Sequence, residues 1–139
     1  MPATTTLQAA AADVAAQHGL ALVVLFGSAA RGGKTPPGDI DIAVKTIAAG
    51  PPLADALAIV NTLIQRLHIQ PIDLVDLRRG DPLLLMQVAQ DGIALYEETP
   101  TTFAEFVSLA ARRYADTAKF RRAEQEYIDN FVRSRKVPK

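Results

Sequence analysis

The segment from Leu20 to Val44 constrains the fold of this chain more than any other. It opens with Leu20–Phe26, seven consecutive apolar residues rich in Leu and Val. Such a run is too short for a helix of its own and is typical of a buried strand. Gly27 and Ser28 follow directly, so a turn of small residues is predicted where this strand ends.

A second strand is predicted from Asp39 to Val44 or Lys45, after a Gly- and Pro-rich loop at residues 32–38. Because side chains alternate between the faces of a strand, Asp39 and Asp41 share one face and the other face is apolar. Two carboxylates placed this closely are costly unless a positive charge lies between them. A divalent cation such as Mg²⁺, which takes oxygen ligands, would supply that charge.

A third strand is predicted over Ile72–Leu77, and it carries two more acids, Asp73 and Asp76. The two lie on opposite faces of that strand, so only one of them can join the first acidic pair. We take Asp73 as the third carboxylate of a site for two ions about 3.5–4 Å apart. Asp76 stays the alternative.

The turn after the first strand has the residue types of a phosphate site. Backbone N–H groups at Gly27 and Ser28, together with the serine hydroxyl, can converge on an anion. Arg31, about one helical turn further on, can add a bidentate charge to the same phosphate. Taken alone, the Gly-Ser pair is weak evidence and favours an ordinary turn over a phosphate site.

Helices are predicted over residues 7–18, 53–67 and 82–91, with a short strand at 93–96. Thr4–Thr6 supply N-cap candidates for the first helix, and Asp81 supplies one for the third. Thr102 and Glu105 form a capping box that opens a final helical segment, with a break expected near residues 116–117. The apolar stripe expected on the second helix consists of Leu53, Leu57, Val60, Ile64 and Leu67.

Length and composition indicate one globular domain of 139 residues, 49% of them hydrophobic. The chain has no cysteine, which excludes a disulfide framework and a thiolate metal site. It shows no signal peptide and no apolar run of membrane-spanning length, so we expect a cytoplasmic protein without a membrane partner. Residues 112–139 hold nine basic and four acidic residues, a local charge of +5 that favours a solvated helix face over nucleic-acid binding.

In combination these motifs resemble a known family. The order GS, ten intervening residues, DID, and then a third acid on a further strand resembles the minimal nucleotidyltransferases, a small prokaryotic branch of the DNA polymerase β superfamily. The resemblance extends to Ala30-Arg31-Gly32, to IDLVDL with the leucine-rich helix after it, and to DGIALYE. Many minimal nucleotidyltransferases resemble antitoxins that are encoded beside a HEPN ribonuclease toxin. The segment Tyr114–Arg122 of this chain is similar to one that such antitoxins carry after the start of their last helix.

The resemblance implies an α/β (α+β) fold, in which helices pack a small mixed sheet and a long helical segment ends the chain. It implies one nucleotidyltransferase domain over residues 1–139, with a core at about 7–98 and a helical segment at about 102–135. Gly27, Ser28 and Arg31 would bind the nucleotide. Asp39, Asp41 and Asp73 would be the catalytic and metal-binding residues, holding two Mg²⁺ ions.

The activity that the resemblance implies is transfer of AMP from ATP to a tyrosine of a separate HEPN-type toxin, with release of pyrophosphate. Three alternatives remain open at this point. The chain could mask its partner without catalysis, or transfer a nucleotide to a small molecule such as an aminoglycoside, or act on tRNA. The third alternative is supported only by the basic tail.

Overall fold

The structure is a computed structural model that describes residues 2–31, 40–48, 50–69 and 71–135. The predicted loop at residues 32–38 and the first acid, Asp39, lie outside these described residues. In chain order the elements are α1 (Thr4–His18), β1 (Leu20–Phe26), β2 (Ile40–Thr46), α2 (Ala56–Leu67), β3 (Ile72–Asp76), α3 (Pro82–Asp91), β4 (Ile93–Glu97), α4 (Thr102–Asp116) and α5 (Ala118–Arg135).

The four strands form one mixed sheet in the order β3-β2-β1-β4. β1 pairs antiparallel with both β2 and β4, whereas β2 and β3 run parallel. All seven residues of β1 are buried, which explains why its sequence is apolar at every position instead of alternating. The predicted mixed sheet is therefore confirmed.

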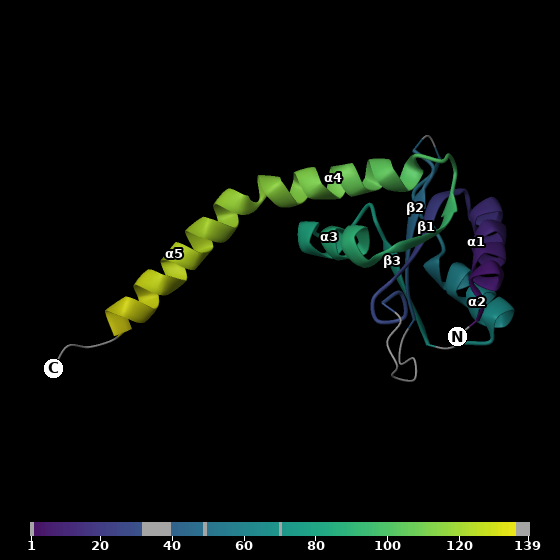
Figure 1. The fold of residues 1–139 in the computed structure, drawn as a ribbon, viewed down its shortest axis with the longest axis horizontal. Helices are drawn as coiled ribbons and strands as arrows, with labels where there is room; N and C mark the ends of the chain where they lie inside the picture. The colour runs from purple at the N-terminus through teal and green to yellow at the C-terminus, as the bar shows by residue number, and fades with distance from the viewer. Residues whose placement is uncertain (1, 32–39, 49, 70, 136–139) are drawn as a thin grey trace.

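Helices cover both faces of the sheet, α1 and α2 on one side and α3 and α4 on the other (Figure 1). Two apolar clusters fill the layers, and the side chains of β1 divide between them. Val23 and Leu25 face α1 and α2, while Leu22, Val24 and Phe26 face α3 and α4. This division follows the two-residue repeat of a strand.

The sequence correctly predicted the end of α1 and the start of α3, but not the start of α1. Gly19 ends α1 in the left-handed region, and Asp81 caps α3 by accepting a hydrogen bond from the backbone N–H of Leu84 at 2.9 Å. The N-cap prediction for Thr4–Thr6 was wrong, because these residues already lie inside α1, whose N-cap is Ala3.

The predicted start of α2 was wrong, and its predicted apolar stripe was confirmed in part. The helix begins after Asp55, which accepts a hydrogen bond from the backbone N–H of Ala58, so Leu53 precedes the helix. Leu57 lies in the first turn and is 69% exposed. The fully buried side is formed by Ile59, Leu63 and Leu67, a spacing of four residues. Of the predicted stripe, Leu67 is buried, and Leu53, Val60 and Ile64 are partly buried against the same cluster. The prediction missed Ile59 and Leu63 and wrongly included Leu57.

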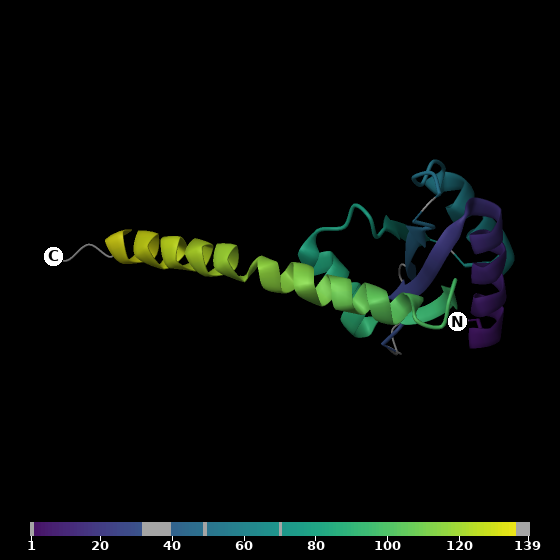
Figure 2. The same ribbon diagram turned by 90° about the horizontal axis from the view of Figure 1, so that it is seen from above.

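The C-terminal segment consists of two helices, with the expected break at Thr117. α4 packs on the sheet through Phe106 and Ala110, whereas no residue of α5 is buried. α5 extends away from the rest of the molecule (Figures 1 and 2). No helix within the described ranges is long and apolar enough to cross a membrane.

Candidate active site

The turn that begins at Gly27 follows the C-terminal end of the buried strand β1. Gly27 has φ +76°, a backbone conformation that residues with a Cβ adopt at a cost. The backbone N–H of Arg31 donates to the Gly27 carbonyl at 3.3 Å, so the chain makes a single helical turn here. The side chain of Ser28 is exposed at this turn.

Two of the predicted acids meet across neighbouring strands. β2 and β3 are parallel, and Asp41 is paired in register with Asp73. Register partners on adjacent strands lie about 5 Å apart and point to the same face of the sheet. That face is the one covered by α3 and α4, because Ala43 and Leu77 continue it into their apolar cluster.

The alternative third acid, Asp76, is placed differently. It is in register with Val44, on the opposite face of β3 from Asp73. Its Oδ1 accepts a hydrogen bond from the backbone N–H of Arg78 at 3.0 Å. Asp76 therefore shapes the turn after β3 and lies away from Asp41.

The Gly27 turn and the Asp41 carboxylate are in direct contact. A Cβ built at residue 27 would collide with Oδ2 of Asp41. Residue 27 must therefore be glycine for two reasons: its positive φ and the carboxylate packed against its backbone. This contact places an acid from β2 beside the predicted phosphate-binding turn of β1.

A cavity of about 300 Å³ opens at this contact. Its walls come from the end of β1, the start of β2 and the last two turns of α3. The lining residues are Phe26, Gly27, Ser28, Arg31, Asp41, Gln87 and Asp91. Four predicted site residues are thus brought together here, while Asp73 approaches from the edge strand β3, outside the lining.

Gln87 and Asp91 were not predicted from the sequence. Asp91 forms an ion pair with Arg31, with 3.4 Å between Nη1 and Oδ2, and the two side chains are 35% and 61% exposed. These residues are 60 positions apart in the chain. The helical pattern at 82–91 fixed their helix, but nothing in that pattern indicated which face of α3 turns toward the Gly-Ser turn.

The described carboxylates fit a divalent metal ion. Asp41 and Asp73 offer oxygen ligands from adjacent strands, as Mg²⁺ prefers, and the neighbouring turn leaves room for phosphate oxygens. Among the described residues there is no group of three or more acidic, His or Cys side chains that could hold an ion. Asp39, the further predicted ligand, lies outside the described residues.

Comparisons with known proteins agree with this geometry. A family model described as "Polymerase beta, Nucleotidyltransferase" matches residues 11–101. The chain is 32% identical over 122 residues to the Protein adenylyltransferase MntA of Aphanizomenon flos-aquae, covering 81% of each chain.

Solved structures give the same result for the fold. One chain of a toxin–antitoxin crystal structure with AMP-PNP matches with a TM-score of 0.72 and 26% identity, over 87% of this chain and 97% of that one. A second match is to a structure of a tri-AMPylated HEPN toxin of Shewanella oneidensis in complex with an MNT antitoxin. Its TM-score is 0.69 at 24% identity, over 91% of this chain and 98% of that one, and it shows the fold.

Proposed function

Because this chain belongs to the polymerase β nucleotidyltransferase family, we propose that it is an antitoxin that transfers AMP from ATP to a tyrosine of a HEPN-type ribonuclease toxin. The observation that carries the proposal is the register pairing of Asp41 with Asp73 beside the Gly27 turn. The similarity to a protein adenylyltransferase supports a protein acceptor and ATP as the donor. The match to a toxin–antitoxin structure with AMP-PNP supports the partner class.

The nucleotide is oriented by the turn after β1. Backbone N–H groups of Gly27 and Ser28, with the serine hydroxyl, bind the terminal phosphates of ATP. Arg31 adds a positive charge at the wall of the same cavity. These contacts hold the leaving pyrophosphate and turn the α-phosphorus toward the acceptor.

The three acids bind the metal ions and prepare the acceptor hydroxyl for attack. Asp39, Asp41 and Asp73 would hold two Mg²⁺ ions, which supply charge neutralisation on the phosphates and activation of the attacking oxygen. Asp73 lies on the edge strand, open to an incoming partner, and helps to remove the proton of the tyrosine hydroxyl. The tyrosine oxygen bonds to the α-phosphorus, the bond between that phosphorus and the pyrophosphate oxygen breaks, and pyrophosphate leaves. In this proposal the reaction is cytoplasmic, because it consumes ATP.

The proposal is tested by incubating the purified protein with ATP, Mg²⁺ and a HEPN toxin encoded beside it. Intact-mass measurement should show the addition of AMP groups to the toxin, located to tyrosine by peptide mapping. Asp41→Asn and Asp73→Asn should abolish this addition. Asp76→Asn is the matched control, because asparagine keeps the oxygen that accepts the Arg78 N–H, and it should retain activity.

Two outcomes would contradict the proposed activity, and a third would contradict the assignment of Asp73. If the toxin gains no mass, the transfer does not occur. If an Asp39→Asn, Asp41→Asn double variant neutralises the toxin as well as the unaltered protein does, the chain acts by masking its partner. If Asp76→Asn is inactive while Asp73→Asn is active, the third carboxylate has been assigned to the wrong residue.

A further inference from the structure

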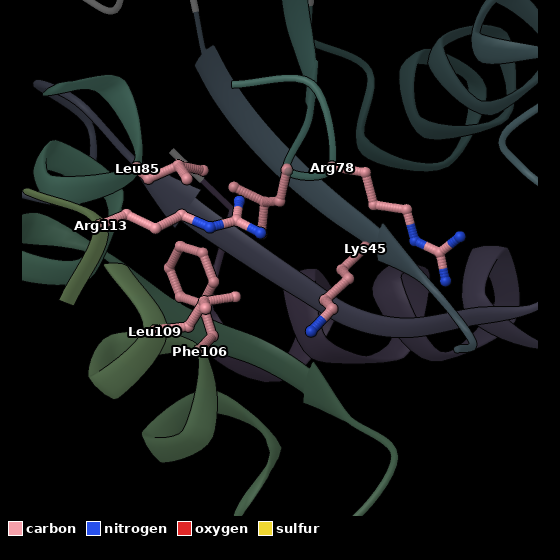
Figure 3. Close-up of a pocket in the computed structure, with 7 residues that line it drawn as sticks. Lys45, Arg78, Leu85, Phe106, Leu109 and Arg113 are labelled. Carbon is pink, nitrogen blue, oxygen red and sulfur yellow. The ribbon is translucent and has the colours of Figure 1, made fainter. Parts of the chain in front are cut away.

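A second cavity lies on the same face of the sheet as the candidate active site, but at the other end of β2. Its volume is about 360 Å³, and it lies between the ends of β2 and β3 and the helices α3 and α4 (Figure 3). Lys45 lines it, four residues after Asp41 on the same strand, a separation of about 13 Å at 3.3 Å per residue. The two cavities share no lining residue.

The charged side chains that line this cavity, among the residues with a described structure, are all positive. Lys45, Arg78 and Arg113 line it, and no acidic residue of the described part of the chain does. Arg78 is held at the rim, because its guanidinium donates to the carbonyls of Thr46 and Ile47 at 3.4 and 3.0 Å. The Lys45 and Arg113 side chains make no hydrogen bond or ion pair with any residue that the structure describes. Two unpaired cations at one cavity are stabilised by an anion between them.

The rest of the cavity wall is apolar. Leu77, Leu85 and Phe106 are buried and belong to the core cluster between the sheet and α3 and α4, and Leu109 completes the lining. In Figure 3 the Arg113 side chain extends toward Lys45 and Phe106, while the Arg78 guanidinium points away from Phe106. Mostly apolar walls with a few charged groups are typical of small-molecule sites, and this volume is near the lower end of their range of about 300–1,000 Å³.

We propose that this cavity is a second ligand site, separate from the active site, for a small phosphate monoester with a flat apolar body. Nucleoside monophosphates belong to this class. A phosphate monoester carries nearly two negative charges at neutral pH and so matches the two unpaired cations, Lys45 and Arg113. A planar body can pack against the partly exposed side chain of Leu109, and an arginine can stack on it. Neither the cavity nor its charges depend on the function proposed above.

The test is calorimetric titration of the whole protein with AMP in the presence of saturating AMP-PNP and Mg²⁺, which occupy the active site. AMP should bind at one further site. The Lys45→Gln, Arg113→Gln double variant should bind AMP about tenfold more weakly or worse, because charged hydrogen bonds are lost. Arg112→Gln is the matched control: it removes the same charge from the neighbouring position of α4, outside the cavity lining, and should bind as the unaltered protein does.

A bulky substitution and two partial ligands test the cavity further. Leu109→Trp adds bulk at the cavity without changing charge and should also block AMP. Inorganic phosphate and adenosine, each carrying one half of the ligand, should bind more weakly than AMP. The proposal is overturned if AMP does not bind beside AMP-PNP, or if the double variant, folded by circular dichroism, binds it undiminished. Equal binding of inorganic phosphate and AMP would overturn the assigned ligand class.

Discussion

Gly27 and Asp41 form the closest contact of the candidate active site, and the contact leaves no space for a side chain on residue 27. Gly27→Ala would impose two costs. The left-handed backbone is unfavourable for alanine by about 1–2 kcal/mol, and the new Cβ would displace the Asp41 carboxylate. We therefore expect AMP transfer to fall by about a hundredfold or more, since misplaced catalytic groups are costly. The measurement is the initial rate of AMP transfer.

Gly19→Ala separates these two costs. Gly19 also has a positive φ, +65°, but a Cβ there would have no atom within 4 Å. This variant should lose a similar free energy of unfolding, about 1–2 kcal/mol, and keep its transfer rate. If both glycine variants lost activity equally, strain in the backbone and not the Asp41 contact would explain the effect.

Arg31 is the only described cation that lines the candidate active site, and its ion pair with Asp91 is exposed. An exposed pair contributes little to stability, so Arg31→Gln should change the free energy of unfolding by less than about 1 kcal/mol. The KM for ATP should rise by about tenfold, because a charged contact to phosphate is lost. Steady-state kinetics with varied ATP gives this value.

The matched control for Arg31 is Arg66→Gln. Arg66 forms an ion pair with Asp13 between α2 and α1, on the other side of the sheet. Its removal should leave the KM for ATP unchanged. A KM that rose equally in both variants would indicate a general effect of lost positive charge, and Arg31 would not be a specific phosphate contact.

At the scale of elements, the start of α4 depends on a residue from the preceding strand. The capping box predicted for Thr102 and Glu105 was wrong: Thr101 is the N-cap, without a side-chain cap, and the Thr102 hydroxyl accepts from the backbone N–H of Thr99. A Glu97 oxygen accepts a hydrogen bond from the backbone N–H of Phe103 at 2.8 Å. Glu97 thus satisfies an unpaired N–H group at the first turn of α4 and places a negative charge at the positive end of the helix.

Removing this contact should loosen α4 from the sheet. Glu97→Ala is expected to lower the free energy of unfolding by about 1 kcal/mol, the typical value of a helix cap. Glu97→Gln keeps an accepting oxygen and should lose less. Chemical denaturation with a fluorescence or circular dichroism readout distinguishes the two. A Glu97→Gln loss as large as that of Glu97→Ala would mean that the charge, and not the hydrogen bond, is the main contribution.

Element bounds that depend on local sequence signals could be predicted from the sequence, whereas features that depend on tertiary packing or strand register could not. β1 and α3 were predicted with their observed bounds, because a continuous apolar run and an Asp-Pro start are local signals. The stripe of α2 was predicted only in part, because packing on the sheet decides that Ile59 and Leu63 are buried while Leu57 is exposed. The pairing of Asp41 with Asp73 also required the register of β2 with β3, which alternation along one strand does not fix.

At the scale of the whole molecule, α3 and α4 pack on the sheet, whereas α5 extends away from it. Both cavities are therefore formed by the packed part of the molecule. The site residues that the sequence missed, Gln87 and Asp91, reach the active site through the packing of α3 on the sheet. The second cavity likewise exists only because α3 and α4 pack together. The predicted core at about 7–98 and helical segment at about 102–135 stay a prediction, since α4 itself packs on that core.

Truncation tests where the stable unit ends. No residue of α5 is buried, and several of its large apolar side chains are exposed, among them Phe120 at 77% and Tyr127 at 72%. Burial of apolar surface is the main source of folding stability. Removal of residues 118–139 should therefore leave the thermal unfolding midpoint within about 3 °C of the full chain, a shift smaller than about 1 kcal/mol would cause.

Removal from residue 102 onward is the contrasting variant. It also deletes Phe106 and Ala110, which are buried against the sheet, and loss of a buried phenylalanine alone costs about 3–5 kcal/mol. This shorter chain should unfold far earlier, or fail to fold, as measured by scanning calorimetry. If the 118–139 deletion were equally damaging, α5 would belong to the cooperative unit despite its exposure. The two deletions together therefore locate the boundary of the stable domain at Thr117 or reject it.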